Sequence, residues 1–197
     1  MKRRIKFVTS VASLTLAMVL MMAGVWAAAT RQVAISGTLS FTGSNVEATV
    51  TVYQSTSATF TLPATNIAIV GTATTFTGAT QTGADVALTP ALSDTVTKYT
   101  FVVKIEGKFP AGSASNIAVD VTVPTAPAQA WLTLTHSGAA TAPTAAATGT
   151  TAADVASING ITGVYYYTFT YTANPATAPA SASGIAFTAS VSLTRAN

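Results

Sequence analysis

The chain of 197 residues contains no cysteine and very little charge. Without a thiol it has no disulfide, no thiolate metal site and no cysteine nucleophile. Charged residues make up 8% of the chain, against about 25% in an ordinary globular domain. A single histidine leaves no pair of imidazoles to hold zinc. We therefore expect a protein that is not an enzyme, with no catalytic residue, no bound metal and no cofactor.

The first 29 residues are typical of a secretory signal peptide. Four basic residues open the chain, and an apolar stretch runs from Phe7 to Trp26. The small residues Ala27-Ala28-Ala29 follow, as a signal peptidase requires. We predict a signal helix over residues 1–29, cleavage after Ala29, and a secreted mature chain that meets the membrane only through its leader. The alternative is an uncleaved signal anchor, since the apolar stretch is nearly long enough to cross a bilayer.

The leader also changes the meaning of the net charge. The whole chain carries +3, from nine basic and six acidic residues. After cleavage, five basic and six acidic residues remain, which gives −1. No basic patch is left, so we expect no nucleic-acid partner.

Alternating apolar and polar residues dominate the mature chain, which is the period of a half-buried β-strand. From Val33 to Phe41 the odd positions are apolar apart from Gly37, and a second run covers 46–53. Gly43-Ser44-Asn45 lies between these two runs and indicates a hairpin. Further runs cover 59–62, 67–70, 86–88, 98–106, 117–123, 131–135, 165–171 and 185–193.

This pattern predicts an all-β fold. No window of the mature chain carries a helical apolar period, and threonine, whose branched side chain suits a pleated sheet, is abundant. We predict roughly nine or ten strands in a two-sheet antiparallel sandwich, jelly-roll or immunoglobulin-like, that forms a single domain over residues 30–197. Residues 108–116, 137–157 and 173–184 are poor in large apolar side chains and are predicted as surface loops.

The titratable residues form no recognisable catalytic pattern. His136 stands at the end of a predicted strand, where we expect it to be exposed. Glu106 and Asp120 lie on the polar faces of their strands, which disfavours the facing carboxyl pair that a glycosidase needs. Asp85 and Asp94 flank a loop, but calcium needs six to eight oxygens, several of them from carboxylates.

Aromatic residues gather in Tyr165-Tyr166-Tyr167. Tyr165 and Tyr167 lie on the same face of the predicted strand as Phe169, because alternate residues of a strand point the same way. They are predicted to lie in the core. Tyr166 then points outward, and Trp131 lies on the polar face of its strand. We predict these last two as exposed aromatic interface residues, since aromatic side chains give a large contact area at low entropy cost.

Two short motifs lie at the end of the leader and in the first strand. They read Ala23-Gly24-Val25-Trp26-Ala27-Ala28-Ala29 and Ile35-Ser36-Gly37-Thr38-Leu39. Over about residues 23–41 the chain resembles the TasA/camelysin family of exported Gram-positive proteins. The resemblance implies a jelly-roll-like sandwich that polymerises into matrix fibres, in which the N-terminal segment of one subunit completes a sheet of the next. Some relatives are labelled metalloproteases, but nothing here matches a zinc-protease helix.

Two hypotheses of function follow. The first is a secreted structural subunit of an extracellular filament, biofilm matrix or surface layer. It assembles with itself by exchange of the N-terminal strand 30–43, which pairs either with its own 46–53 strand or with a neighbour's sheet edge. The assembly candidates are Val33, Ile35, Leu39 and Phe41. The alternative is a cell-surface carbohydrate-binding or adhesive module that uses Trp131 and Tyr166 to bind a surface glycan.

Overall fold

The structure is a computed structural model that describes residues 32–63, 65–70, 74–89, 91–108, 116–122, 128–147, 157–161, 163–179 and 181–196. Within 157–161 and 181–184 it describes the backbone alone. The predicted signal helix and the cleavage position at Ala29 lie outside the described residues.

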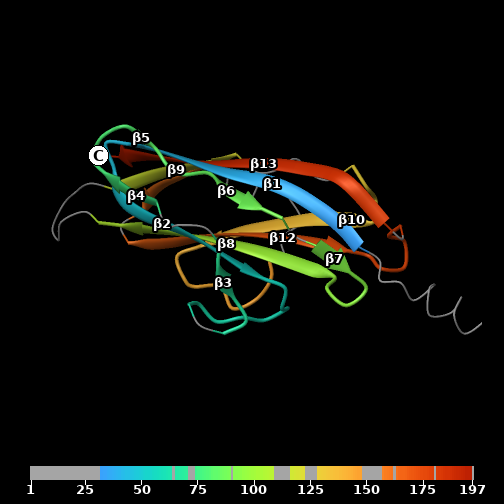
Figure 1. The fold of residues 1–197 in the computed structure, drawn as a ribbon. Helices are drawn as coiled ribbons and strands as arrows, with labels where there is room; N and C mark the ends of the chain where they lie inside the picture. The colour runs from blue at the N-terminus through green and yellow to red at the C-terminus, as the bar shows by residue number, and fades with distance from the viewer. Residues whose placement is uncertain are drawn as a thin grey trace, which may run out of the picture. The chain divides into compact units, whose positions relative to one another are not determined.

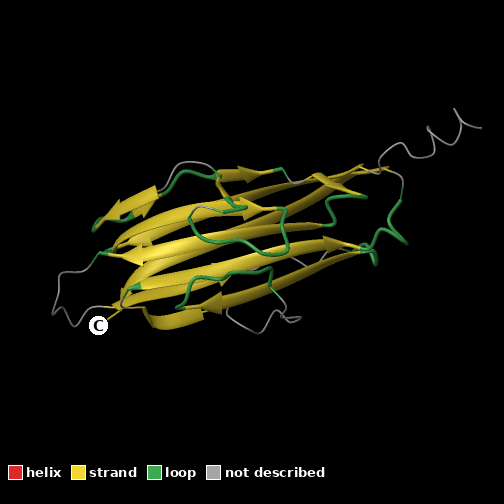
Figure 2. Ribbon diagram, turned by 90° about the horizontal axis from the view of Figure 1, so that it is seen from below, coloured by secondary structure: helices red, strands yellow, loops and turns green. Residues whose placement is uncertain are grey.

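The described residues form strands and loops without a helix, so the all-β prediction is confirmed there (Figures 1 and 2). Two sheets lie one over the other. Sheet A has seven strands, in the order β11 (Ser157–Ile161), β9 (Asn116–Thr122), β13 (Ser181–Ala196) and β1 (Gln32–Ser44), with β5 (Gln81–Thr82), β6 (Val86–Leu88) and β7 (Ala91–Ser93) on the far side of β1. Sheet B has six strands, in the order β10 (Leu132–Ala139), β12 (Val164–Ala173), β8 (Lys98–Gly107) and β2 (Glu47–Ser55), with β3 (Ala68–Ile69) and β4 (Thr74–Thr77) on the far side of β2.

The centre of sheet A departs from the predicted antiparallel arrangement. β1 and β13 run parallel, in a register that extends from the pair Gln32 and Ser181 to the pair Ser44 and Thr194. On its other side β1 pairs antiparallel with β5, β6 and β7. The prediction of wholly antiparallel sheets is therefore wrong at the β1–β13 pair.

The predicted hairpin between the first two strands does not form. The chain leaves β1 at Ser44 and enters β2 at Glu47, in the other sheet. Asn45 has a φ of 52° at this crossing, in the left-handed region that asparagine tolerates. Both edges of β1 are occupied by other strands of sheet A, so the turn residues serve a crossing between the layers.

The main core lies between the sheets, where both contribute their inward side chains. Sheet A supplies residues such as Leu39, Val119 and Leu193. Sheet B supplies Phe101, Val103, Ile105, Tyr167, Phe169 and Tyr171. The predicted core positions Tyr167 and Phe169 are confirmed, at 2% and 4% exposure.

A second, smaller cluster covers the outer face of sheet B. Tyr53 and Val102 point away from the main core and pack with Phe60, from the segment between β2 and β3. The strand predicted over 59–62 is absent as a ladder, and the described chain has single bridges there, between Thr59 and Ala145 and between Thr61 and Thr65. The segment after β2 thus closes over a sheet face that the alternation had assigned to solvent.

Buried threonine hydroxyls anchor a further segment to the same face. Thr170 Oγ1 lies 3.1 Å from Thr100 Oγ1, and both residues are almost fully buried. The amide of Ala147 donates to Thr170 Oγ1 at 3.0 Å, and Thr135 Oγ1 donates to the carbonyl of Ala147 at 2.8 Å. Part of the predicted loop 137–157 is therefore hydrogen-bonded to the sheet.

We expect Thr170→Val to lower the free energy of unfolding by about 1–3 kcal/mol, because it leaves the Ala147 amide without its acceptor. Valine has nearly the shape of threonine, so packing changes little. Thr188→Val is the matched control, at an exposed position of β13 where the change should stay within about 0.5 kcal/mol. Urea unfolding measures both, and equal midpoints for the two variants would contradict the assigned role of Thr170.

Candidate functional site

The first described strand, β1, is the structural element most closely tied to the predicted assembly function. It lies in the middle of sheet A, as Figure 1 shows, rather than at an edge. Its neighbour on one side is β13, the last strand of the described chain. On the other side it meets three strands of two or three residues each.

The four assembly candidates of β1 all face inward. Val33, Ile35, Leu39 and Phe41 are 1–2% exposed and belong to the main core. The prediction that these odd-numbered residues share the buried face of the strand is therefore confirmed. Each fully buried aliphatic or aromatic side chain contributes about 1.5–3 kcal/mol of hydrophobic stabilisation. In the described structure the apolar face of this strand is thus buried within the protein's own core.

A glycine in β1 makes room for a ring from the neighbouring strand. Gly37 is paired with Phe187 of β13, and a Cβ at Gly37 would lie 2.1 Å from Cζ of that ring. The Phe187 ring also lies 5.0 Å from the Tyr171 ring and 6.3 Å from the Phe101 ring, measured between centroids. Gly37 therefore lets Phe187 connect the β1–β13 pair to the aromatic side chains of sheet B.

The outer face of β1 is polar and uncharged. Ser36, Thr38 and Thr42 are exposed there, and their partners on β13 are Ala186, Thr188 and Ser192. Because small side chains without charge cover both strands, this surface has little electrostatic repulsion toward a second copy.

The two predicted interface aromatics are not freely exposed, so that part of the prediction is wrong. Trp131 is half-buried and packs against the main core. Tyr166 does point outward from sheet B, but it is half-buried against the cluster of Tyr53, Phe60 and Val102. The segment between β2 and β3 covers the face on which Tyr166 lies, and parity alone cannot reveal such a cover.

The structure also corrects the expectation for His136. Its side chain is 6% exposed and lies within β10, opposite the buried Phe169. Strand β10 extends through Ala139, four residues beyond the predicted end, and this extension carries the imidazole inward. His136 is therefore a core residue of sheet B.

The acidic candidates are separated by the fold. Glu106 lies in β8 of sheet B, and Asp120 lies in β9 of sheet A. Lys104 Nζ donates to Glu106 Oε2 at 2.8 Å, and this hydrogen bond lowers the pKa of Glu106 and raises that of Lys104. Both side chains are partly exposed, so the pair stabilises the fold by at most about 1 kcal/mol.

Asp85 and Asp94 are both exposed. Within the part of the chain that the structure describes, no three histidine or acidic side chains lie close enough together to hold a metal ion. No helix among the described residues has the length and apolar character needed to cross a bilayer.

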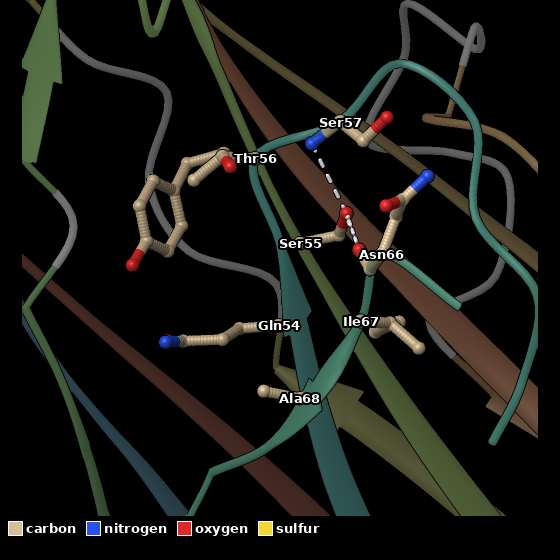
Figure 3. Close-up of a pocket in the computed structure, with 8 residues that line it drawn as sticks. Gln54, Ser55, Thr56, Ser57, Asn66, Ile67 and Ala68 are labelled. Atoms are coloured by element: carbon tan, nitrogen blue, oxygen red, sulfur yellow. Dashed lines mark hydrogen bonds between the residues drawn. The ribbon is translucent and has the colours of Figure 1, made fainter. Parts of the chain in front are cut away.

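A hollow at the end of β2, shown in Figure 3, was not predicted from the sequence. Its lining comes from residues 54–57, 66–68 and Tyr99. These positions are far apart in the chain and share no periodic pattern, so no sequence signal could have found it.

Comparison with models of known protein families and with curated proteins finds no match for the chain.

We expect Gly37→Ala to destabilise the protein by about 1–3 kcal/mol, because its Cβ overlaps the Phe187 ring. Gly163→Ala is the matched control, since a Cβ there meets nothing within 4 Å. Thermal and urea unfolding of the two variants give the comparison. The close approach of Phe187 to Gly37 would be disproved if the Gly37 variant unfolded with the midpoint of the wild type.

Proposed function

We propose that the protein is a secreted structural subunit of an extracellular filament or matrix, and that copies join by exchanging strand β1. The observation that carries this proposal is the position of β1. It is the first described strand, it is central in sheet A, and it supplies four buried side chains to the core. A strand with these properties is what a neighbouring copy needs to complete its own sheet.

Within the described fold, β1 can leave its place in sheet A without threading through another part of the chain. The strand is connected to the rest of the described fold at one end, through Asn45 and Val46. When it leaves, it opens a slot between β13 and the short strands β5, β6 and β7. A second copy carries the same side chains, so its β1 can fill this slot in the same register.

The energetics of such an exchange favour assembly at high concentration. The closed subunit and the exchanged pair contain the same β1 contacts, so their energies differ chiefly in the crossing near Asn45 and in the entropy of association. Reciprocal exchange would give a closed dimer. Head-to-tail exchange would leave one open slot and one free strand at the ends and would extend into a filament.

Removing β1 is a poor test of this proposal, because the core would lose Val33, Ile35, Leu39 and Phe41 together. A tether that keeps β1 in its own subunit is sharper. Thr38 and Ala87 are paired across β1 and β6, and both are exposed. Paired antiparallel residues are about 4.5–5.5 Å apart at Cα, within the range that a disulfide spans. The chain has no cysteine of its own to interfere.

We expect the variant Thr38→Cys/Ala87→Cys to assemble when reduced and to remain monomeric when it is oxidised in dilute solution first. Oxidation after assembly should instead link different chains, which appear as a ladder on a non-reducing denaturing gel. Light scattering and negative-stain microscopy of the purified secreted protein measure assembly.

The matched control is Thr133→Cys/Thr172→Cys, which joins β10 to β12 within sheet B. It should assemble in both redox states and form cross-links within single chains. The exchange proposal fails if the oxidised β1–β6 variant assembles as readily as the reduced one, or if the reduced protein stays monomeric at every concentration tested.

A further inference from the structure

One edge of sheet B is formed by a long, regular strand. Strand β10 pairs with β12 on one side, and no other described strand pairs with its second side. It has eight residues, and its register with β12 runs without a shift from Leu132 to Ala139. The other edge positions of the two sheets are held by strands of two to five residues. β10 is therefore the longest edge strand in the described part of the chain.

A hydrogen bond at the start of β10 shows which of its peptide groups face outward. The amide of Asn174, just after β12, donates to the carbonyl of Trp131, just before β10, at 2.8 Å. The register of the two strands continues from this pair, so the odd-numbered residues of β10 are those that exchange hydrogen bonds with β12. The N–H and C=O groups of Leu134, His136 and Gly138 therefore point away from β12, toward the open edge.

This edge lacks the features that keep edge strands from pairing with other chains. Among the described residues, no backbone group bonds to Leu134, His136 or Gly138 from the open side. Natural edge strands are protected by charged side chains, proline or bulges. β10 reads Leu-Thr-Leu-Thr-His-Ser-Gly-Ala, with no lysine, arginine, acidic residue or proline, and the neighbouring β12 is also free of these. The edge thus offers donors and acceptors to a further strand.

We infer that β10 pairs antiparallel with β10 of a second copy across a two-fold axis, so that two copies of sheet B become one continuous sheet. A two-fold axis makes such a contact self-complementary, because residue i contacts residue j and residue j contacts residue i. With the axis at Thr135, Leu134 of each copy lies opposite His136 of the other. Both residues point their backbone groups outward, so each such pair can exchange two hydrogen bonds.

The side chains favour this register over the next one. With the axis at Thr135, this threonine faces its own counterpart and Thr133 faces Ser137, and hydroxyl pairs of this kind stabilise neighbouring strands. On the inner face the half-buried Leu134 packs beside the imidazole of His136. Moving the axis to His136 would set two imidazoles opposite each other and leave Leu134 beside Gly138, which has no side chain to cover it.

A contact through one strand pair is small, so it acts between assembled copies. It falls below the approximately 1,200 Å² of total buried surface under which interfaces are weak and transient. Dilute subunits therefore stay monomeric, whereas filaments that each carry many β10 edges join side by side through many weak contacts. This role in bundling rests on the proposed function. The pairing itself uses no residue of β1 or of sheet A.

Two charge variants test the contact and its register together. Thr133→Lys/Ser137→Lys places lysine opposite lysine across the axis, which destabilises an antiparallel pair, whereas Thr133→Lys/Ser137→Glu places lysine opposite glutamate. Thr133 is exposed and Ser137 is half-buried, both on the outer face. Within one copy the two positions are about 13 Å apart along the strand. Their charges therefore act on each other only weakly at physiological salt.

Both variants are made in the oxidised Thr38→Cys/Ala87→Cys protein, in which β1 is held in its own subunit, and self-association is followed by sedimentation equilibrium over rising concentration. We expect the tethered parent to dimerise at high concentration. The Lys/Lys variant should dimerise about tenfold more weakly, and the Lys/Glu variant at least as strongly as the parent. High salt should reduce the difference between the two variants.

Ala186→Lys/Ser190→Lys is the matched control. It adds the same charges at the same spacing on β13, on the outer face of sheet A, and should dimerise like the tethered parent. Urea unfolding shows whether each variant keeps its fold. The inference is overturned if the tethered parent forms no dimer at any concentration reached, if the Lys/Lys variant dimerises like the parent, or if the Lys/Glu variant is as weak as the Lys/Lys variant.

Failure of this contact and failure of strand exchange give different results. A dimer of the tethered parent that the Lys/Lys change weakens supports β10 pairing, even if the reduced protein forms no filaments. Filaments of the reduced protein that remain single, together with a tethered parent that stays monomeric at high concentration, support strand exchange and contradict β10 pairing. Negative-stain microscopy of the reduced proteins distinguishes single filaments from bundles.

Discussion

The parallel pairing of β1 with β13 is the interaction on which the rest of the fold depends. It places β1 in the middle of sheet A, where β5, β6 and β7 can pair with its other edge. These strands have two or three residues each and need a long partner to exist as strands at all. The same pairing sets the Phe187 ring over Gly37 and beside Tyr171, so the two sheets meet through aromatic contacts that the β1–β13 register determines.

Threonine performs two different tasks in the two sheets. On the outer face of sheet A, residues such as Thr38 and Thr188 are exposed and keep the surface polar without charge. On the outer face of sheet B, Thr100 and Thr170 are buried and use their hydroxyls to bind each other and the covering segment at Ala147. Because the hydroxyl can satisfy a backbone group while the methyl group packs, a chain with few charges can cover one sheet face and leave the other open.

Alternation in the sequence predicted which side of each long strand faces the main core, but it predicted neither the strand partners nor the cover over the outer face of sheet B. The inward positions of β1 and the core positions Tyr167 and Phe169 follow from parity alone. The pairing of Gln32 with Ser181 does not, since a parallel neighbour leaves no turn signal between its strands. Alternation also predicted that Tyr166 is exposed, whereas the segment between β2 and β3 covers the face on which it lies. The length of β10 was underestimated, because Ser137, Gly138 and Ala139 have weak strand preference. The hollow beside Tyr99 is lined by three separate segments of the chain, and the sequence pattern does not show that they meet.

The distance along the chain between β1 and β13 also determines when sheet A can be completed during folding. A chain that emerges from its N-terminus exposes β1 long before residues 181–196 are available to pair with it. Contacts of such high sequence separation form slowly, because the loop between them must close first. Sheet A therefore stays incomplete until β13 arrives, whereas the described strands of sheet B are all available by then.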